Sequence, residues 1–317
     1  MKHITLGKTG IEVSELCFGT LPFGPLQKNI DVDTASEVIA YALHKGVNYI
    51  DTAAMYGTYD HIRLALQKTG YRPVISSKST AADYDGMIRD VRAAIDALGV
   101  DYVDIFFLHA ARVGVNVFSE RAGALKALIE CKEKGMIKAI GISTHDVRVT
   151  SLAARQNDID IVFPIINMLG RGVLGGTLNE MVSSIEECHA ANKGIVLMKA
   201  LGGGTLVGDY IKAMDYCSRI SKGRAAISLG MLSNDEVDMN MMYFSSQDIS
   251  ELAGALKASD KRFIVVKLLC VKCGKCEEGC HSGAISQING EVVIDSELCI
   301  TCGYCVKACK EFAIRMV

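Results

Sequence analysis

The stretch "DTASEVIAYALHKGVNYIDTA", residues 33–53, joins a helix-like segment to a strand-like one. Residues 33–46 carry apolar side chains at helical spacing and end on Gly46, a typical helix stop signal. The closing "YIDTA" at 49–53 is short and apolar, as a buried strand is. The stretch therefore predicts one unit of alternating helix and strand.

The same alternation extends through the first 260 residues. Seven more strand-like runs are separated by helix-length segments. These runs are "VSELCFGT" (13–20), "PVISSKS" (73–79), "YVDIFFLH" (102–109), "AIGIST" (139–144), "IVFPII" (161–166), "GIVLMK" (194–199) and "AAISLG" (225–230). Eight alternations in roughly 250 residues predict an α/β fold of the (β/α)8 TIM-barrel type. A doubly wound open sheet is the alternative, but no glycine-rich dinucleotide fingerprint follows the first strand.

Composition limits the classes of function. The 317 residues are half apolar with a formal net charge of −2, which suits a large core and provides no basic surface for nucleic acid. The opening "MKHITLGKTG" does not resemble a secretory signal, and no apolar run has the length of a membrane span. We therefore expect a cytoplasmic protein with no nucleic-acid or membrane partner. In that reducing compartment, regularly spaced thiols indicate metal rather than disulfides.

The last fifth of the chain holds eight of the twelve cysteines, in the runs "CVKCGKCEEGC" (270–280) and "CITCGYCVKAC" (299–309). Both runs have the spacing C-x2-C-x2-C-x3-C of bacterial ferredoxins, in which the fourth cysteine of each run ligates the other cluster. That resemblance assigns two [4Fe-4S] clusters. The first would bind Cys270, Cys273, Cys276 and Cys309, and the second Cys299, Cys302, Cys305 and Cys280. A structural zinc site is the alternative, although a duplicated three-cysteine run with a remote fourth fits tetrahedral zinc poorly.

The segment between the two runs, "AISQINGEVVID" at 284–295, alternates apolar and polar residues around an Asn-Gly pair, the pattern of a β-hairpin. Residues 263–317 have the length of a complete two-cluster ferredoxin. We therefore expect a barrel at 1–262 followed by a small α+β ferredoxin-like domain at 263–317.

Ionisable residues close three neighbouring strand-like runs. Asp51 ends its run and Tyr56 follows in the next loop, while Lys78 and His109 end the two runs after it. Active sites of (β/α)8 barrels lie at the carboxyl ends of the strands, so these side chains are expected to meet. A structural Asp51–Lys78 ion pair beside a buried histidine is the alternative.

Five motifs in order resemble the aldo-keto reductase family: "LGKTGIEVSELCFGT", "YIDTAAMYG", "LGVDYVDIFFLH", "GMIKAIGIST" and "LGMLSNDEVDMN". The resemblance implies a catalytic tetrad and a small carbonyl substrate. Tyr56 would donate a proton to the carbonyl oxygen, and Lys78, held by Asp51, would favour the phenolate. His109 would orient the carbonyl.

The resemblance also implies NAD or NADP as cofactor. Ser143 and Asn167 match positions that hold the nicotinamide carboxamide, and ordinary turn hydrogen bonding is their alternative role. Lys199 begins "KALGGG", which resembles the loop over the pyrophosphate.

The adenosine end of the cofactor site departs from the family. Asn240 fits the adenine-contacting position, but Gly230, Leu232 and Glu236 stand where basic residues would bind the 2′-phosphate of NADP. A carboxylate repels a phosphate, so NADP preference is doubtful.

Together these features predict an oxidoreductase whose barrel reduces a carbonyl or related unsaturated group while the clusters relay electrons. Nicotinamide transfers two electrons as hydride whereas each cluster carries one, so a flavin mediator is possible. A redox partner protein is also possible, and the clusters could instead act as a structural staple. The alternative is a nicotinamide-binding or partner-binding barrel that serves a plain electron carrier.

Overall fold

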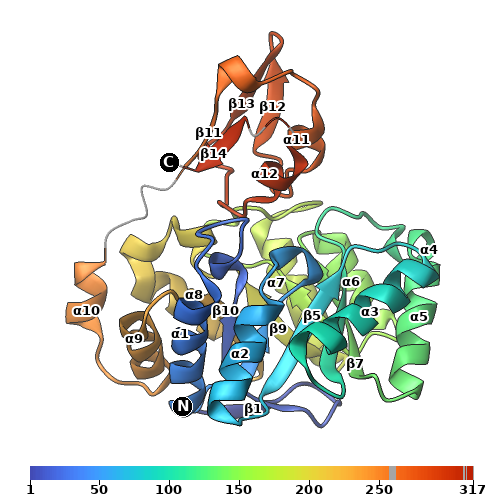
Figure 1. Ribbon diagram of the computed structural model, residues 1–317, viewed down its shortest axis with the longest axis vertical. Coiled ribbons are helices and arrows are strands. Elements are labelled where there is room, and N and C mark those ends of the chain that lie inside the picture. The colour runs from blue at the N-terminus through green and yellow to red at the C-terminus, as the bar shows by residue number, and fades with distance from the viewer. Residues whose placement is uncertain (257–261, 310, 312, 317) are drawn as a thin grey trace.

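The computed structural model describes residues 1–256, 262–309, 311 and 313–316. Eight parallel strands close into a barrel in the order β10-β3-β4-β5-β6-β7-β8-β9, which confirms the predicted fold (Figure 1). The strands are β3 (Leu16–Gly19), β4 (Tyr49–Asp51), β5 (Val74–Ser79), β6 (Val103–His109), β7 (Ile137–Thr144), β8 (Ile161–Pro164), β9 (Gly194–Met198) and β10 (Ala225–Gly230). Each predicted strand-like run overlaps one of them, and β7 begins two residues before its predicted run.

Helices surround the barrel (Figure 1). They are α1 (Val32–His44), α2 (Tyr59–Thr69), α3 (Tyr84–Leu98), α4 (Val117–Glu120), α5 (Ala122–Glu133), α6 (Val147–Arg155), α7 (Leu178–Ala190), α8 (Tyr210–Ser221), α9 (Asn234–Phe244) and α10 (Ser250–Ala255). Side-chain caps fix several starts: Thr177 and Glu180 form a capping box at α7. In the described part of the chain, no helix combines the length and apolar character that crossing a membrane requires.

The first predicted strand, residues 13–20, is divided in the structure. β2 (Glu12–Ser14) pairs with β1 (His3–Thr5) in an antiparallel hairpin, and the barrel strand β3 begins only at Leu16. The break lies at Glu15, next to Ser14, whose hydroxyl donates to the Leu16 carbonyl at 2.6 Å and whose amide donates to the Asn48 side chain at 2.6 Å. These side-chain bonds take Ser14 out of the barrel ladder.

The barrel interior is filled with side chains. Phe107 and Phe163 pack with ring centroids 5.4 Å apart, and Tyr49 is fully buried in the same cluster. A Cβ at Gly141 would lie 2.2 Å from the Phe107 ring, so only glycine allows that ring its place. The interior is a packed core, and the barrel's functional surface lies at its mouth.

The C-terminal unit contains two small antiparallel sheets and two short helices. They are β11 (Phe263–Val265) with β14 (Ile314–Met316), β12 (Ile285–Ile288) with β13 (Glu291–Ile294), α11 (Lys275–Glu278) and α12 (Tyr304–Ala308). The β12–β13 turn places Asn289 and Gly290 at φ 51° and 74°, as a type I′ turn requires, which confirms the predicted hairpin. The predicted boundary between residues 262 and 263 falls immediately before β11, and the preceding residues 257–261 lie outside the described part of the chain.

The short 3₁₀ helices are η1 (Leu21–Phe23), η2 (Ala54–Tyr56), η3 (Gly202–Gly204), η4 (Val207–Asp209) and η5 (Lys267–Leu269).

The C-terminal unit lies over one end of the barrel (Figure 1). Polar contacts join the two. The Arg112 guanidinium donates to the carbonyls of Glu277 and Glu278 at 2.9 and 3.1 Å, and Arg171 pairs with Glu297 at 3.0 Å. Because these bonds come from two separate barrel loops, they fix the position of the unit over the strand ends.

A second set of contacts is made by the loop at residues 300–303. Thr301 donates its hydroxyl to the Gly203 carbonyl, and Gln27 Nε2 donates to the Thr301 carbonyl at 3.2 Å. A Cβ at Gly203 would lie 1.8 Å from the Ile300 carbonyl oxygen. The loop and η3 therefore meet backbone to backbone.

Replacing Gly203 with alanine is expected to loosen this contact. Gly203 has φ 73°, and Gly223 is a matched control with φ 65° whose added Cβ would meet only Glu15, at 3.7 Å. Both substitutions carry the left-handed strain of about 1 kcal/mol, but only Gly203→Ala adds a clash. Limited proteolysis should cut the C-terminal unit of Gly203→Ala markedly faster than that of Gly223→Ala. Equal cleavage rates would contradict the close contact.

Candidate active site

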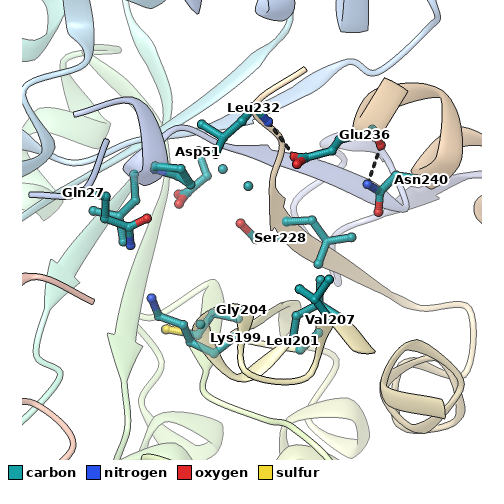
Figure 2. Close-up of a pocket in the computed structure, with 18 of the residues that line it drawn as sticks. Gln27, Asp51, Lys199, Leu201, Gly204, Val207, Ser228, Leu232, Glu236 and Asn240 are labelled. Atoms are coloured by element: carbon teal, nitrogen blue, oxygen red, sulfur yellow. Dashed lines mark hydrogen bonds between the residues drawn. The ribbon is translucent and has the colours of Figure 1, made fainter. Parts of the chain in front are cut away.

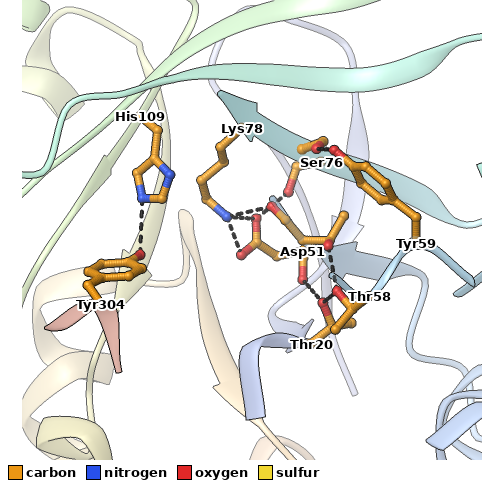
Figure 3. Close-up of polar contacts among 10 residues, drawn as sticks. Thr20, Asp51, Thr58, Tyr59, Ser76, Lys78, His109 and Tyr304 are labelled. Atoms are coloured by element: carbon orange, nitrogen blue, oxygen red, sulfur yellow. Dashed lines mark hydrogen bonds and ion pairs between the residues drawn. The ribbon is translucent and has the colours of Figure 1, made fainter. Parts of the chain in front are cut away.

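A buried ion pair stands at the carboxyl ends of β4 and β5. Lys78 Nζ lies 2.6 Å from both carboxylate oxygens of Asp51 and donates to the Thr52 carbonyl at 2.8 Å, as Figure 3 shows. Ser76 donates to the same carboxylate at 2.6 Å. Burial raises the pKa of Asp51 and lowers that of Lys78, while their mutual attraction opposes both shifts. The lysine is thus held in one position with its protons directed at oxygen.

Tyr56 lies beside this pair at the end of η2. Its ring is 7% exposed and 5.1 Å from Lys78 Nζ. Burial first, and then the neighbouring Tyr304 and Asp51, raise the pKa of the Tyr56 phenol well above its ordinary value. A nearby Lys78 is expected to lower the pKa of Tyr56, but the charge of Lys78 is paired with Asp51, and the pKa is raised instead. The phenol therefore keeps its proton at neutral pH, as an acid must.

His109 ends β6 and is buried. Burial, followed by the charge of Lys78, lowers the pKa of His109 well below its ordinary value, so its imidazole is neutral at pH 7. The His109 and Tyr56 rings meet edge to face with centroids 6.2 Å apart. The hydrogen-bond partner of His109 Nε2 is the hydroxyl of Tyr304, at 3.2 Å (Figure 3). The structure thus gathers all four predicted tetrad residues, with a fifth side chain added.

A cavity of about 390 Å³ opens beside the ion pair. Asp51 lies at one end and Glu236 and Asn240 at the other (Figure 2). Tyr56 and Lys78 also line the cavity. The cavity runs between the loop after β9 and the loop after β10. Its length and its two polar ends suit an extended ligand.

The eight cysteines of the two runs line two separate cavities. The first, about 110 Å³, is bordered by Cys270, Cys273, Cys276 and Cys309. The second is tighter, about 10 Å³, and is bordered by Cys280, Cys299, Cys302 and Cys305. In each cavity three cysteines of one run meet the fourth cysteine of the other, the donor set of a two-cluster ferredoxin. Among the described residues, no three His, Cys, Asp or Glu side chains form a group able to hold a single metal ion.

Comparison with known proteins gives the family. The family model described as "Aldo/keto reductase family" matches residues 15–269. The chain belongs to the aldo-keto reductase family. A second model, "4Fe-4S dicluster domain", matches residues 269–314, so this aldo-keto reductase carries an iron–sulfur domain after its barrel.

Individual relatives are distant. The chain is 27% identical over 187 residues to "Aldo-keto reductase YhdN" of Bacillus subtilis, covering 54% of this chain and 55% of that protein. It is 27% identical over 209 residues to "L-galactose dehydrogenase" of Arabidopsis thaliana, covering 62% and 63%. The matched region is about half the length of the curated relatives.

Solved structures share the fold. The "aldo-keto reductase AKR11C1 from Bacillus halodurans (holo form)" superposes with a TM-score of 0.64 at 20% identity, covering 80% of this chain and 94% of that one. A putative aldo-keto reductase from Pseudomonas aeruginosa gives 0.63 at 24% identity, covering 77% and 94%. Both matches cover the barrel portion of this aldo-keto reductase.

The five predicted cofactor residues separate into two groups. Lys199, Gly230 and Asn240 line the cavity, whereas Ser143 and Asn167 are buried and are not among its lining residues. Asn167 bonds the backbone of Arg171 through both ends of its amide, each at 2.9 Å. For Asn167 the observed contacts are those of ordinary turn hydrogen bonding.

The polar side chains at the far end of the cavity, Asn240 and Glu236, already form hydrogen bonds within the protein. Asn240 Oδ1 accepts from Tyr210 at 2.6 Å, and Nδ2 donates to the Glu236 carbonyl at 2.6 Å. The Glu236 carboxylate accepts from the Leu232 amide at 2.7 Å. A negative charge is therefore fixed at the end where the family would bind a phosphate.

Two site residues were not predicted from the sequence. Tyr304 lies in the second cysteine run and His281 directly follows the first, and their rings pack together with centroids 4.0 Å apart next to His109. His281 also lies edge-on to His145, at 6.3 Å. Their neighbouring cysteines identify a cluster loop, but no local pattern indicates that the loop enters a barrel mouth.

Proposed function

We propose that this aldo-keto reductase reduces a carbonyl or a related unsaturated group at its barrel site, using electrons relayed by two [4Fe-4S] clusters. One observation carries the proposal: the loop between Cys299 and Cys305 places Tyr304 in hydrogen-bond contact with His109. One side chain thus connects the predicted cluster loop to the predicted catalytic site. A structural staple does not require that contact.

Tyr56 is the proposed proton donor. It lines the cavity, and its raised pKa keeps the phenol protonated until a substrate oxygen gains electron density. The Lys78–Asp51 ion pair also lines the cavity, and it packs beside the Tyr56 ring and fixes the position of that ring. Reduction of a carbonyl to an alcohol takes two electrons and two protons. Tyr56 Oη would give the proton to the oxygen, and the hydrogen on carbon would come as hydride from a bound nicotinamide or flavin.

The two cysteine cavities fit [4Fe-4S] clusters by their donor sets of four thiols each. Such clusters, when bound, supply electrons one at a time. The set containing Cys302 adjoins the barrel, because the backbone continues from Cys302 to Tyr304. Cys273 of the other set is exposed, which suits electron entry from a redox partner protein. We also propose that the barrel domain spans 1–262 and the iron–sulfur domain 263–317, because every residue that lines the two cysteine cavities lies at or after residue 263.

The proposed small-molecule cofactor is a nicotinamide dinucleotide, with NAD favoured over NADP. The extended cavity suits a dinucleotide, and Glu236 opposes a 2′-phosphate. A flavin is the alternative. A carrier of this kind is needed wherever hydride transfer meets the one-electron clusters, because a flavin can exchange both one and two electrons.

The first test is anaerobic. The purified protein is assayed for iron and flavin, NADH or NADPH is added, and cluster absorbance is followed near about 400 nm. Loss of cluster absorbance that reverses when a carbonyl substrate is added would support electron transfer between the iron–sulfur domain and the barrel site. Clusters that are reduced by dithionite but not reoxidised by any carbonyl or other unsaturated compound offered would contradict the relay.

The crossed cluster assignment makes a prediction about iron content. Cys280→Ser with Cys302→Ser is expected to cost one cluster, about four of about eight irons, because both residues serve the same site. Cys276→Ser with Cys280→Ser, in a single run, should cost both clusters. Cys131→Ser, a buried cysteine in α5, is the control and should retain all the iron. Uncrossed ligation predicts the reverse for the two double variants.

A further inference from the structure

Tyr304 occupies a specific place on the barrel. Its hydroxyl lies 3.2 Å from His109 Nε2, and its ring is 7% exposed. The His109 and Tyr304 rings meet edge to face with centroids 6.0 Å apart. The His281 ring packs against the Tyr304 ring with centroids 4.0 Å apart, which adds to the burial of Tyr304.

The Tyr304 hydroxyl takes the hydrogen bond of His109 Nε2 that the family resemblance assigns to a substrate oxygen. The tetrad resemblance puts a carbonyl oxygen between Tyr56 and His109, and Tyr304 adjoins both of these residues. The cavity reflects this arrangement. Tyr56 and Lys78 line it, whereas His109 is not among its lining residues. Tyr304 is not a lining residue either, so a ligand in the cavity reaches Tyr56 but not His109, whose Nε2 is already bonded to the Tyr304 hydroxyl.

The Tyr304 loop is fixed closely to the barrel. A Cβ at Gly303 would lie 2.0 Å from the Leu26 carbonyl oxygen, so the backbones touch just before the tyrosine. Thr301, bonded to Gly203 and Gln27, secures the same loop. Contacts on both barrel loops oppose withdrawal of Tyr304 during turnover.

We propose that Tyr304 determines substrate specificity by filling the oxygen site on His109. Resting on the proposed function, this identifies the substrate class as unsaturated compounds that bond Tyr56 from the cavity alone. Aldehydes and ketones that need both Tyr56 and His109 are excluded. The site is thus shared by both parts of the chain, and its selectivity is set by a residue between two predicted cluster ligands.

The test measures access to His109 and needs no turnover. The full-length holoprotein is treated with diethyl pyrocarbonate, and modification of each histidine is followed by mass spectrometry. In the unsubstituted protein His109 should react at least ten-fold more slowly than His3, which is exposed. In Tyr304→Ala, His109 should react at least ten-fold faster than before.

Two further variants separate the explanations. Tyr304→Phe retains the ring and should keep His109 protected, and Tyr71→Ala, at an exposed tyrosine, should leave His109 unchanged. Iron content is measured in every variant. If His109 in the unsubstituted protein reacts as fast as His3, or if Tyr304→Ala leaves it protected, the proposal is wrong.

A specificity measurement completes the test. With NADH or NADPH as donor, Tyr304→Ala should gain at least ten-fold in kcat/KM for 4-nitrobenzaldehyde, while Tyr304→Phe should not. Exposed His109 without that gain would overturn the specificity role. It would leave the proton-donor role of Tyr56, which is tested separately, untouched.

Discussion

Tyr56→Phe is expected to lower the rate of substrate reduction by roughly two to four orders of magnitude, the usual contribution of a positioned general acid. The phenylalanine ring can keep the same packing beside Lys78 and His109, because only the hydroxyl is lost. Ligand binding in the cavity should therefore persist. The measurement is single-turnover reduction of substrate by the pre-reduced holoprotein, with ligand affinity determined in parallel.

The matched control is Tyr59→Phe. Tyr59 lies three residues on, and its hydroxyl bonds Ser77 at 2.7 Å outside the cavity lining. This variant should turn over normally. If Tyr56→Phe also turned over normally, the barrel would be a binding module and not the site of reduction.

The raised pKa of Tyr56 also predicts a pH profile. An acid with a raised pKa remains protonated as pH rises, so activity that depends on Tyr56 should persist above about pH 10, the ordinary tyrosine value. The rate is measured with pre-reduced protein to separate the barrel step from electron entry. An alkaline loss centred between pH 7 and 9 would mean that another group donates the proton.

The strand pattern was readable because each barrel strand is a short apolar run buried on both faces. Residues 13–20 were misjudged for a local reason. The run is apolar enough to be one strand, but Ser14 pairs with His3 in the β1–β2 hairpin while its hydroxyl bonds the Leu16 carbonyl, so the barrel strand begins only at Leu16. That competition between side chain and backbone depends on Asn48, which is 34 residues away.

From the sequence, the candidate site could be predicted only for residues that the barrel fold itself brings together. Asp51, Lys78 and His109 end neighbouring strands, so barrel closure alone brings them together. Tyr304 and His109 are 195 positions apart in the sequence, and no periodic sequence pattern predicts a contact between residues so far apart. The glycines that permit it, Gly203 and Gly303, look like ordinary turn glycines in the sequence.

Lys78→Met is expected to lower the free energy of unfolding by roughly 3 to 5 kcal/mol, because it leaves Asp51 buried without its partner. The Asp51 carboxylate has a 6% exposed side chain and would keep only the bond from Ser76. Its pKa should rise further as burial goes unopposed. The expected fall in Tm is roughly 5 to 15 °C, measured on the iron-loaded protein.

Removing both charges distinguishes the pair from its individual members. Asp51→Leu combined with Lys78→Met leaves no uncompensated charge, and paired apolar replacements of buried ion pairs are often neutral or stabilising. The double variant should therefore recover most of the lost Tm while remaining inactive. Recovery of stability without activity would mean that the Asp51–Lys78 pair serves to position Tyr56 in the cavity and not to stabilise the fold. A double variant as unstable as Lys78→Met would instead mean that the bond from Lys78 to the Thr52 carbonyl, and not charge balance, holds this strand end.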